Sequence, residues 1–157
     1  MKLISLLERL EYTCIQGSTD QEVKNVVYDS RKVEEGSLFI CIRGAVVDGH
    51  KFVPDVIAKG AKVLVVEEKV EAPADVTVIL VKDSRYAMAF ISAAYFGYPA
   101  EKLKTIGITG TKGKTTTTYM VKSILENAGY KVGLIGTIEA IIGDKVIPAS
   151  NTTPESY

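Results

Sequence analysis

Residues 104–128 read KTIGITGTKGKTTTTYMVKSILENA and decide how the second half of the chain is interpreted. The stretch opens with β-branched residues at Ile106 and Ile108, a pattern that predicts a buried strand. A glycine-rich turn follows from Gly110 to Gly113, and apolar residues then recur with helical spacing up to Ala128. A strand, a turn that ends in Gly-Lys-Thr and a helix form the layout of a phosphate-binding loop.

This turn has the chemistry of a triphosphate site. Glycines let backbone N–H groups converge on phosphate oxygens, and the start of the following helix adds partial positive charge. Lys114 is expected to reach the β- and γ-phosphates as the catalytic cation, and the Thr115 hydroxyl to ligate Mg²⁺. We therefore predict an ATP site built from Gly110, Thr111, Lys112, Gly113, Lys114, Thr115 and Thr116. The alternative is an ordinary glycine turn, because the general motif has a glycine at the position of Ile108.

The bulk composition excludes several classes of protein. The chain has 157 residues, 46% hydrophobic and 24% charged, enough for one domain or for a small domain with part of another. Its 19 basic and 19 acidic residues cancel, so neither a nucleic acid nor a membrane surface is expected as a partner. The N-terminus is too charged for a signal peptide, and we expect a cytoplasmic protein whose Cys14 and Cys41 are buried, reduced thiols, although two cysteines can also pair.

The residues before the turn predict a small α/β unit over about 1–100. The leucines of residues 3–10 have the spacing of a short amphipathic helix. We expect strands at 23–29, 37–42, 62–67 and 76–81, and helices at 55–59 and from Asp83 or Ser84 onward. After the turn, the sequence predicts a strand at 131–136 and a hairpin of 139–142 with 145–147. The predicted fold class is therefore α/β, with domains at 1–101 and 102–157, the second being the start of a P-loop domain.

Three stretches of the chain resemble the Mur ligase family, the ATP-dependent amide ligases of peptidoglycan precursor synthesis. They are Asp29-Ser30-Arg31 with the following Gly36–Phe39, Arg43-Gly44 and Asp48–Phe52; Gly107–Thr117, whose compact loop is the family's own form; and Leu134–Ile138 with Asn151-Thr152-Thr153-Pro154-Glu155. The third stretch is similar to the branch that adds a diamino acid to UDP-N-acetylmuramoyl-L-alanyl-D-glutamate. The resemblance spans nearly the whole chain.

The resemblance implies a three-domain enzyme of which this chain carries the UDP-binding domain and the beginning of the ATPase domain. It implies that Ser30, with Tyr28 beside it, binds the uracil end of the acceptor, and that Asn151, Thr152 and Thr153 hold the muramoyl-dipeptide near ATP. Residues 45–47 align with the family's uridine-side loop. The expected co-substrate is a diamino acid, meso-diaminopimelate rather than L-lysine, and the expected state is a monomer. The family's carbamylated lysine, catalytic glutamate and arginine motif would lie beyond Tyr157, so the fragment alone is expected to be inactive.

Two other functions fit parts of the sequence. The first 100 residues are also compatible with a stand-alone UDP-sugar-binding fragment, and the loop with a generic P-loop NTPase or kinase. Residues outside the motif have simpler interpretations. We expect Arg31 to form a structural or surface ion pair rather than to contact a ligand, and His50, the single histidine, to be polar surface without a catalytic role.

Overall fold

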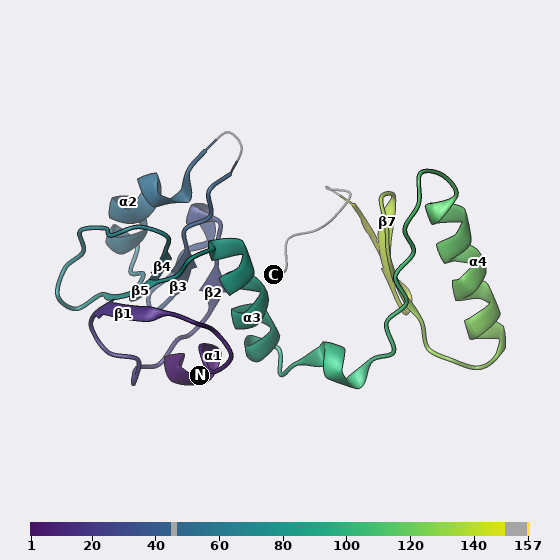
Figure 1. Cartoon of the computed structure of the whole chain (residues 1–157), viewed down its shortest axis with the longest axis horizontal. Coiled ribbons are helices and arrows are strands. Elements are labelled where there is room, and N and C mark those ends of the chain that lie inside the picture. Colours follow the sequence, from purple (N-terminus) through teal and green to yellow (C-terminus); the bar gives the residue numbers. More distant parts are fainter. Residues whose placement is uncertain (45–46, 150–156) are drawn as a thin grey trace. The chain divides into compact units, whose positions relative to one another are not determined.

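The computed structural model describes residues 1–44, 47–149 and 157. The chain divides into two compact units, of which the first comprises Met1–Leu103 with Tyr157 and the second begins at Lys104. Each unit combines a β-sheet with at least one helix (Figure 1), so the predicted α/β fold class is confirmed.

The first unit is built on a five-stranded sheet in the order β1-β5-β4-β3-β2. Its strands are β1 (Thr13–Gln16), β2 (Val26–Val27), β3 (Leu38–Ile40), β4 (Val63–Val66) and β5 (Thr77–Leu80). Strands β2 to β5 run parallel, whereas β1 pairs antiparallel with β5 at the edge. The four parallel strands lie within the predicted ranges, but β1 was not predicted, because its four residues are partly or fully exposed and carry no apolar alternation.

Successive side chains of the parallel strands fill two cores, one on each face of the sheet. Leu38 and Ile40 join one cluster, and Phe39 joins the other. The first cluster is covered by α1 (Leu3–Leu6) and α3 (Ser84–Tyr95), and the second by η2 (Gly49–Phe52) and α2 (Val53–Ala58), as Figure 1 shows. This coverage explains the unbroken apolar runs of β3 and β4, which water reaches on neither face.

Aspartate side chains cap the starts of α3 and η1. Asp83 accepts hydrogen bonds from the backbone N–H groups of Arg85 and Tyr86 and so begins α3, as predicted. Asp29 accepts from the N–H of Arg31 at the start of η1 (Ser30–Lys32). The unit ends at η3 (Pro99–Lys102), where the Tyr98 hydroxyl donates to the Glu8 carboxylate at 2.7 Å.

Within residues 104–149, the part of the second unit that the structure describes, there is one α-helix and an antiparallel sheet. Helix α4 (Lys114–Asn127) packs against β6 (Gly133–Ile135), which continues into β7 (Glu139–Ile142) and β8 (Lys145–Pro148) in the order β6-β7-β8. The predicted hairpin around Gly143 is confirmed. The predicted buried strand at Ile106–Ile108 is wrong: these residues form no strand, and Ile106 is 62% exposed. A parallel strand needs hydrogen-bonded neighbours, and the three strands described in this unit pair only with one another.

The two cysteines differ from the prediction in one respect. Both are free thiols, but only Cys41 is buried, whereas Cys14 is exposed on the edge strand β1. Burial, together with the nearby carboxylates of Asp48 and Glu67, raises the pKa of Cys41 to about 12.

Candidate functional site

The predicted phosphate loop lies at the start of α4, with its backbone open to solvent. Gly113 caps the helix with φ 76°, a left-handed conformation that strongly favours glycine, and a Cβ there would meet no atom within 4 Å. The glycine is therefore required by the backbone angle rather than by crowding. Gly110, Thr111, Lys112 and Lys114 are exposed, while Thr115 is half-buried.

Side chains of the loop brace its backbone. The Lys114 ammonium donates to the carbonyl oxygen of Gly110 at 2.6 Å, so it lies across the mouth of the turn. The Thr117 hydroxyl donates to the Gly113 carbonyl at 2.9 Å, and the Thr118 hydroxyl to the Thr115 carbonyl at 2.7 Å. These bonds use carbonyl groups and leave the N–H groups at the helix start available.

The loop therefore has the properties of an anion site. The first N–H groups of a helix lack partners inside the helix and carry partial positive charge. In the part of the chain that the structure describes, the N–H groups of residues 111–116 donate no hydrogen bond to protein. An incoming phosphate would meet these donors and the Lys114 cation together.

A second candidate site lies in the first unit, where the parallel strands end. Ligands of open α/β sheets bind outside the carboxyl ends of the strands. Tyr28, 39% exposed, and Ser30 follow β2 at this edge. The Lys59 ammonium donates to the Ser30 carbonyl oxygen at 2.8 Å and fixes the backbone, whereas the Ser30 hydroxyl has no hydrogen-bond partner among the described residues.

Arg31 pairs with Asp29 rather than presenting a free cation to this edge. Its Nε and terminal nitrogen donate to the two carboxylate oxygens of Asp29 at 2.9 and 2.7 Å. The same side chain, with the backbone N–H of Arg31, holds the pKa of Asp29 far below its usual range. The prediction that Arg31 forms a structural or surface ion pair is confirmed.

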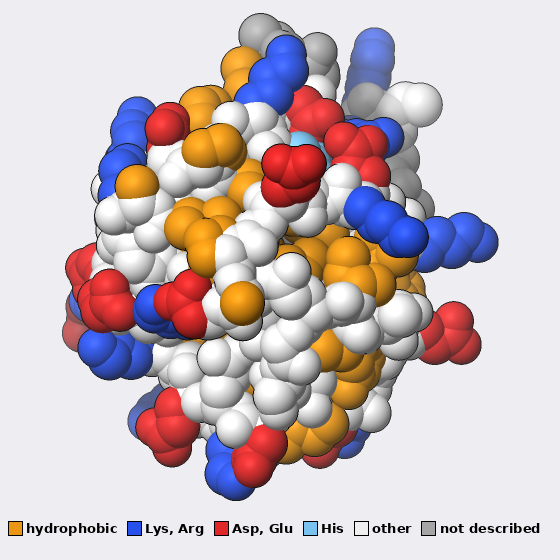
Figure 2. All heavy atoms as spheres, turned by 90° about the vertical axis from the view of Figure 1, so that its left-hand side faces the viewer, with side chains coloured by type: hydrophobic (Ala, Val, Ile, Leu, Met, Phe, Trp, Pro, Cys, Tyr) orange, Lys and Arg blue, Asp and Glu red, His pale blue; other side chains and the backbone are white. Residues whose placement is uncertain are grey.

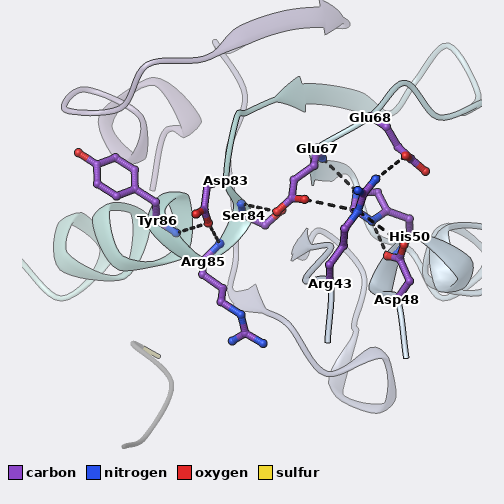
Figure 3. Close-up of polar contacts among 9 residues, drawn as sticks. All are labelled: Arg43, Asp48, His50, Glu67, Glu68, Asp83, Ser84, Arg85 and Tyr86. Atoms are coloured by element: carbon purple, nitrogen blue, oxygen red, sulfur yellow. Dashed lines mark hydrogen bonds and ion pairs between the residues drawn. The ribbon is translucent and has the colours of Figure 1, made fainter. Parts of the chain in front are cut away.

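Sequence reasoning missed a polar network at the ends of β3 and β4. His50 was predicted to be polar surface, which is wrong, since the residue is only 8% exposed. Its Nδ1 lies 2.6 Å from the Asp48 carboxylate, and its Nε2 accepts the backbone N–H of Glu67 at 3.0 Å (Figure 3). The hydrogen bonds from the backbone and ring of His50 lower the pKa of Asp48. A lone histidine in a polar loop gives no sequence signal of such burial.

Some predicted residues lie outside the described part of the chain. Asn151, Thr152 and Thr153 belong to this group, as do Ala45 and Val46 of the loop that precedes Asp48. Val47 is described and is 48% exposed. The structure thus presents the loop at Gly110–Thr116 and the Tyr28–Ser30 segment in separate units.

Further observations concern the charges on the surface, groups of metal-binding side chains and membrane-spanning helices. The face of the molecule in Figure 2 carries basic and acidic side chains intermixed, with hydrophobic groups between them. Among residues 1–44, 47–149 and 157, no group of three or more His, Cys, Asp or Glu side chains is arranged to hold a metal ion. None of the described helices has the length and apolar character to cross a bilayer.

In a comparison with known protein families, each of the two units matches a family. The family described as "Mur ligase family, catalytic domain" matches residues 22–96, and "Mur ligase middle domain" matches residues 108–157. The chain belongs to the Mur ligase family. A relative from Clostridium perfringens, named UDP-N-acetylmuramoyl-L-alanyl-D-glutamate--2,6-diaminopimelate ligase, is 54% identical over 100% of this chain. The match covers 32% of that relative, so this Mur ligase chain spans about a third of its length.

Solved structures of Mur ligases share the fold. A structure of a UDP-N-acetylmuramoyl-L-alanyl-D-glutamate--2,6-diaminopimelate ligase matches 96% of this chain and 30% of its own, with a TM-score of 0.71 and 22% identity. The MurF ligase of Thermotoga maritima, solved in complex with ADP, matches 73% of this chain and 25% of its own, with a TM-score of 0.52 and 27% identity. At 22% identity, the likeness to the first of these two structures shows a shared fold alone.

Proposed function

We propose that this chain is the N-terminal part of an ATP-dependent ligase of peptidoglycan precursor synthesis, which adds meso-diaminopimelate to UDP-N-acetylmuramoyl-L-alanyl-D-glutamate. The observation that carries the proposal is the 54% identity, over the whole chain, to a ligase named for that reaction. The exposed loop at the start of α4 supports it, because such an enzyme needs a triphosphate site.

The proposed division of labour follows the two units. Residues 1–101 would bind the UDP end of the acceptor, and residues 102–157 would begin the ATPase domain. On the acceptor side, Ser30 is favoured because the residue is half-buried at the carboxyl edge of the sheet and its hydroxyl has no partner among the described residues. Tyr28, exposed beside it, would contact the uracil ring. Asn151, Thr152 and Thr153 remain proposed ligands of the muramoyl-dipeptide.

The proposed reaction has two steps. The side-chain carboxylate of the D-glutamate attacks the γ-phosphorus of ATP, the bond to ADP breaks, and an acyl phosphate forms. The amine of the diamino acid then attacks the acyl carbon, loses a proton, and phosphate leaves as the amide forms. Catalysis of the first step is mainly positioning and charge stabilisation.

The residues of the loop have distinct proposed roles. Lys114 would leave the Gly110 carbonyl and offset charge on the moving phosphoryl group. The N–H groups of residues 111–116, including those of Thr111, Lys112 and Thr116, would cradle phosphate oxygens. A Mg²⁺ ion would neutralise charge on the triphosphate, and the half-buried Thr115 hydroxyl fits as a single protein ligand, since Mg²⁺ takes its others from phosphate and water.

The test is a product assay on the complete ligase. The protein is incubated with UDP-N-acetylmuramoyl-L-alanyl-D-glutamate, ATP and Mg²⁺, with either meso-diaminopimelate or L-lysine. We expect acceptor-dependent ADP formation and a product whose mass increases by one diaminopimelate residue. Tight acceptor binding without ADP formation would instead favour a UDP-sugar-binding protein, and a lysine adduct would correct the choice of diamino acid.

A further inference from the structure

Helix α4 carries the proposed phosphate loop at its start, and within residues 104–149 little apolar packing holds it to the sheet. It packs against β6, where Leu134 is buried, while its own Met120 and Ile124 are 60% and 68% exposed. The hydrogen bonds of Lys114 and Thr117 lie within the loop and the first turn of the helix. They fix the conformation of the loop, but not the direction of α4 relative to the sheet.

Among the residues that the structure describes, one side-chain hydrogen bond joins α4 to the sheet. The Tyr119 hydroxyl donates to the carboxylate of Glu139, the first residue of β7, and both residues are half-buried. The bond raises the pKa of Tyr119 above its usual range, so the phenol keeps its proton at neutral pH and remains the donor. The other side-chain hydrogen bonds of α4 end on the loop or on the helix itself, as that from Lys122 to Glu126 does at 2.6 Å.

Tyr119 lies one turn beyond the loop, on the face of α4 that also carries Thr115. Residues three and four apart share one face of a helix. Thr115, Thr118 and Tyr119 have this spacing and are half-buried, so this face is the one that packs on the sheet. The bond to Glu139 therefore acts about 6 Å along the helix axis from Thr115, close to the N–H groups that the helix start leaves free.

Glu139 is held by the backbone of the sheet. The Gly136 N–H donates to the Glu139 carbonyl at 3.1 Å and closes the turn between β6 and β7. On its other side, Glu139 pairs with Pro148 in the register of β7 and β8. A carboxylate on a paired strand gives α4 a fixed point, whereas a carboxylate on a free loop would move with the helix.

We propose that Tyr119 and Glu139 are positioning residues for the triphosphate, because their hydrogen bond fixes α4 against the sheet and so orients the N–H groups of residues 111–116 and the Lys114 cation. The inference rests on the proposed function, which places ATP at this loop. The donors of an anion site act together only when they converge on the same oxygens, so a tilt of the helix start weakens all of them at once. Neither side chain has to touch the nucleotide.

The test is a double-mutant cycle in the complete ligase. Tyr119→Phe removes only the hydroxyl, and Glu139→Ala removes its acceptor. We expect each variant to raise the KM for ATP about three- to tenfold, the effect of one hydrogen bond. The KM for UDP-N-acetylmuramoyl-L-alanyl-D-glutamate should stay within about twofold of the wild type. Because both changes remove the same bond, the double variant should be no more impaired than a single one. Glu139→Gln keeps an oxygen that accepts the hydroxyl and should lie closer to the wild type.

The control variant is Glu126→Gln. It removes a charged pair with Lys122 that stays within the same helix, so the KM for ATP should remain within about twofold of the wild type. Three results would each overturn the inference. The effects of Tyr119→Phe and Glu139→Ala could multiply in the double variant, which would make the two residues independent. Tyr119→Phe could lower only the thermal midpoint, which would leave the bond a role in stability alone. Glu139→Gln could be as impaired as Glu139→Ala, which would assign the effect to the charge.

The wild type separates this inference from the proposed function. If it turns over ATP in the presence of the acceptor and the variants behave in one of those three ways, the inference alone is wrong. If the wild type shows no acceptor-dependent ATP turnover, the proposed function fails, and the inference with it.

Discussion

The two units differ in how much apolar surface they bury. In the first, a sheet with mostly parallel strands carries a packed cluster on each face, and residues such as Phe39 and Leu64 are almost fully shielded from water. In the second, Leu134 is the single buried side chain among residues 104–149, and Ile135, Ile138 and Ile142 are each more than half exposed. The first unit therefore has the buried interior of an independent domain. The second unit carries the phosphate loop although its described residues bury almost no apolar interior.

The difference follows from the layers that each unit contains. The first sheet has helices on both faces. The described residues of the second unit supply one helix for its three-stranded sheet, which leaves part of the apolar side chains in water. A three-stranded sheet and one helix bury little surface, and net stability depends on the excess of burial over chain entropy. The phosphate loop nonetheless has a defined conformation, because the hydrogen bonds that hold it lie within the loop and the first turn of α4.

Hydrogen exchange should show the largest contrast. In the 157-residue chain, we expect the amides of β3, β4 and β5 to exchange more than about a thousandfold slower than those of α4, because opening the first unit requires global unfolding while α4 opens locally. Exchange measured by mass spectrometry with peptide resolution checks this. Equal protection in the two units would show that the second has a stable interior of its own.

A pair of truncations should sharpen the same contrast. Phe39→Ala removes a side chain that is 1% exposed and should lower the free energy of unfolding by about 3–5 kcal/mol. Ile135→Ala removes one that is 65% exposed and should change it by less than about 0.5 kcal/mol. Urea unfolding followed by circular dichroism measures both, and a large effect of Ile135→Ala would reveal burial that the structure does not show.

The two thiols offer a chemical probe of the first unit. At pH 8 we expect Cys14 to react with a thiol reagent about a hundredfold faster than Cys41, because the thiolate is the reactive form and Cys41 is buried. The pKa of Cys41 is raised to about 12, above its unfolded value, so folding disfavours its thiolate and stability should fall as the pH rises above about 8.5. Labelling of the single variants Cys14→Ser and Cys41→Ser identifies each rate, and comparable rates would contradict the burial.

The smallest expected effect concerns Asp29. Arg31 lowers the pKa of this carboxyl below the unfolded value of about 3.9, so its stabilising contribution is present above that pH and is lost as the pH falls through the folded pKa. Asp29→Asn retains an oxygen for the Arg31 N–H but loses the charge. The thermal midpoint of the variant should lie slightly below the wild type at pH 7, and the difference should shrink below about pH 4. A difference independent of pH would exclude the ion pair as its cause.

The sequence allowed prediction of what depends on strong local patterns. The apolar runs of β3 and β4, the Asp83 cap and the glycine turn before α4 each have a local physical cause, and each was predicted. Two predictions that depended on tertiary partners were wrong, the buried strand at Ile106–Ile108 and the exposure of His50. Ile106 and Ile108 have strand propensity but no strand beside them, and the burial of His50 depends on Asp48 and on the N–H of Glu67, which is distant in sequence. The edge strand β1 lacks an apolar pattern, since its residues are partly or fully exposed.

We assign ATP to the second unit and the UDP end of the acceptor to the first. The most direct test of this assignment is acyl-phosphate formation by the complete ligase, measured by hydroxylamine trapping at saturating acceptor. Lys114→Ala should abolish the trapped product, because the γ-phosphate loses its cation. Ser30→Ala should form it normally at saturation while weakening acceptor binding by about 1 kcal/mol. Near-normal trapping by Lys114→Ala would contradict the assignment of the loop to ATP.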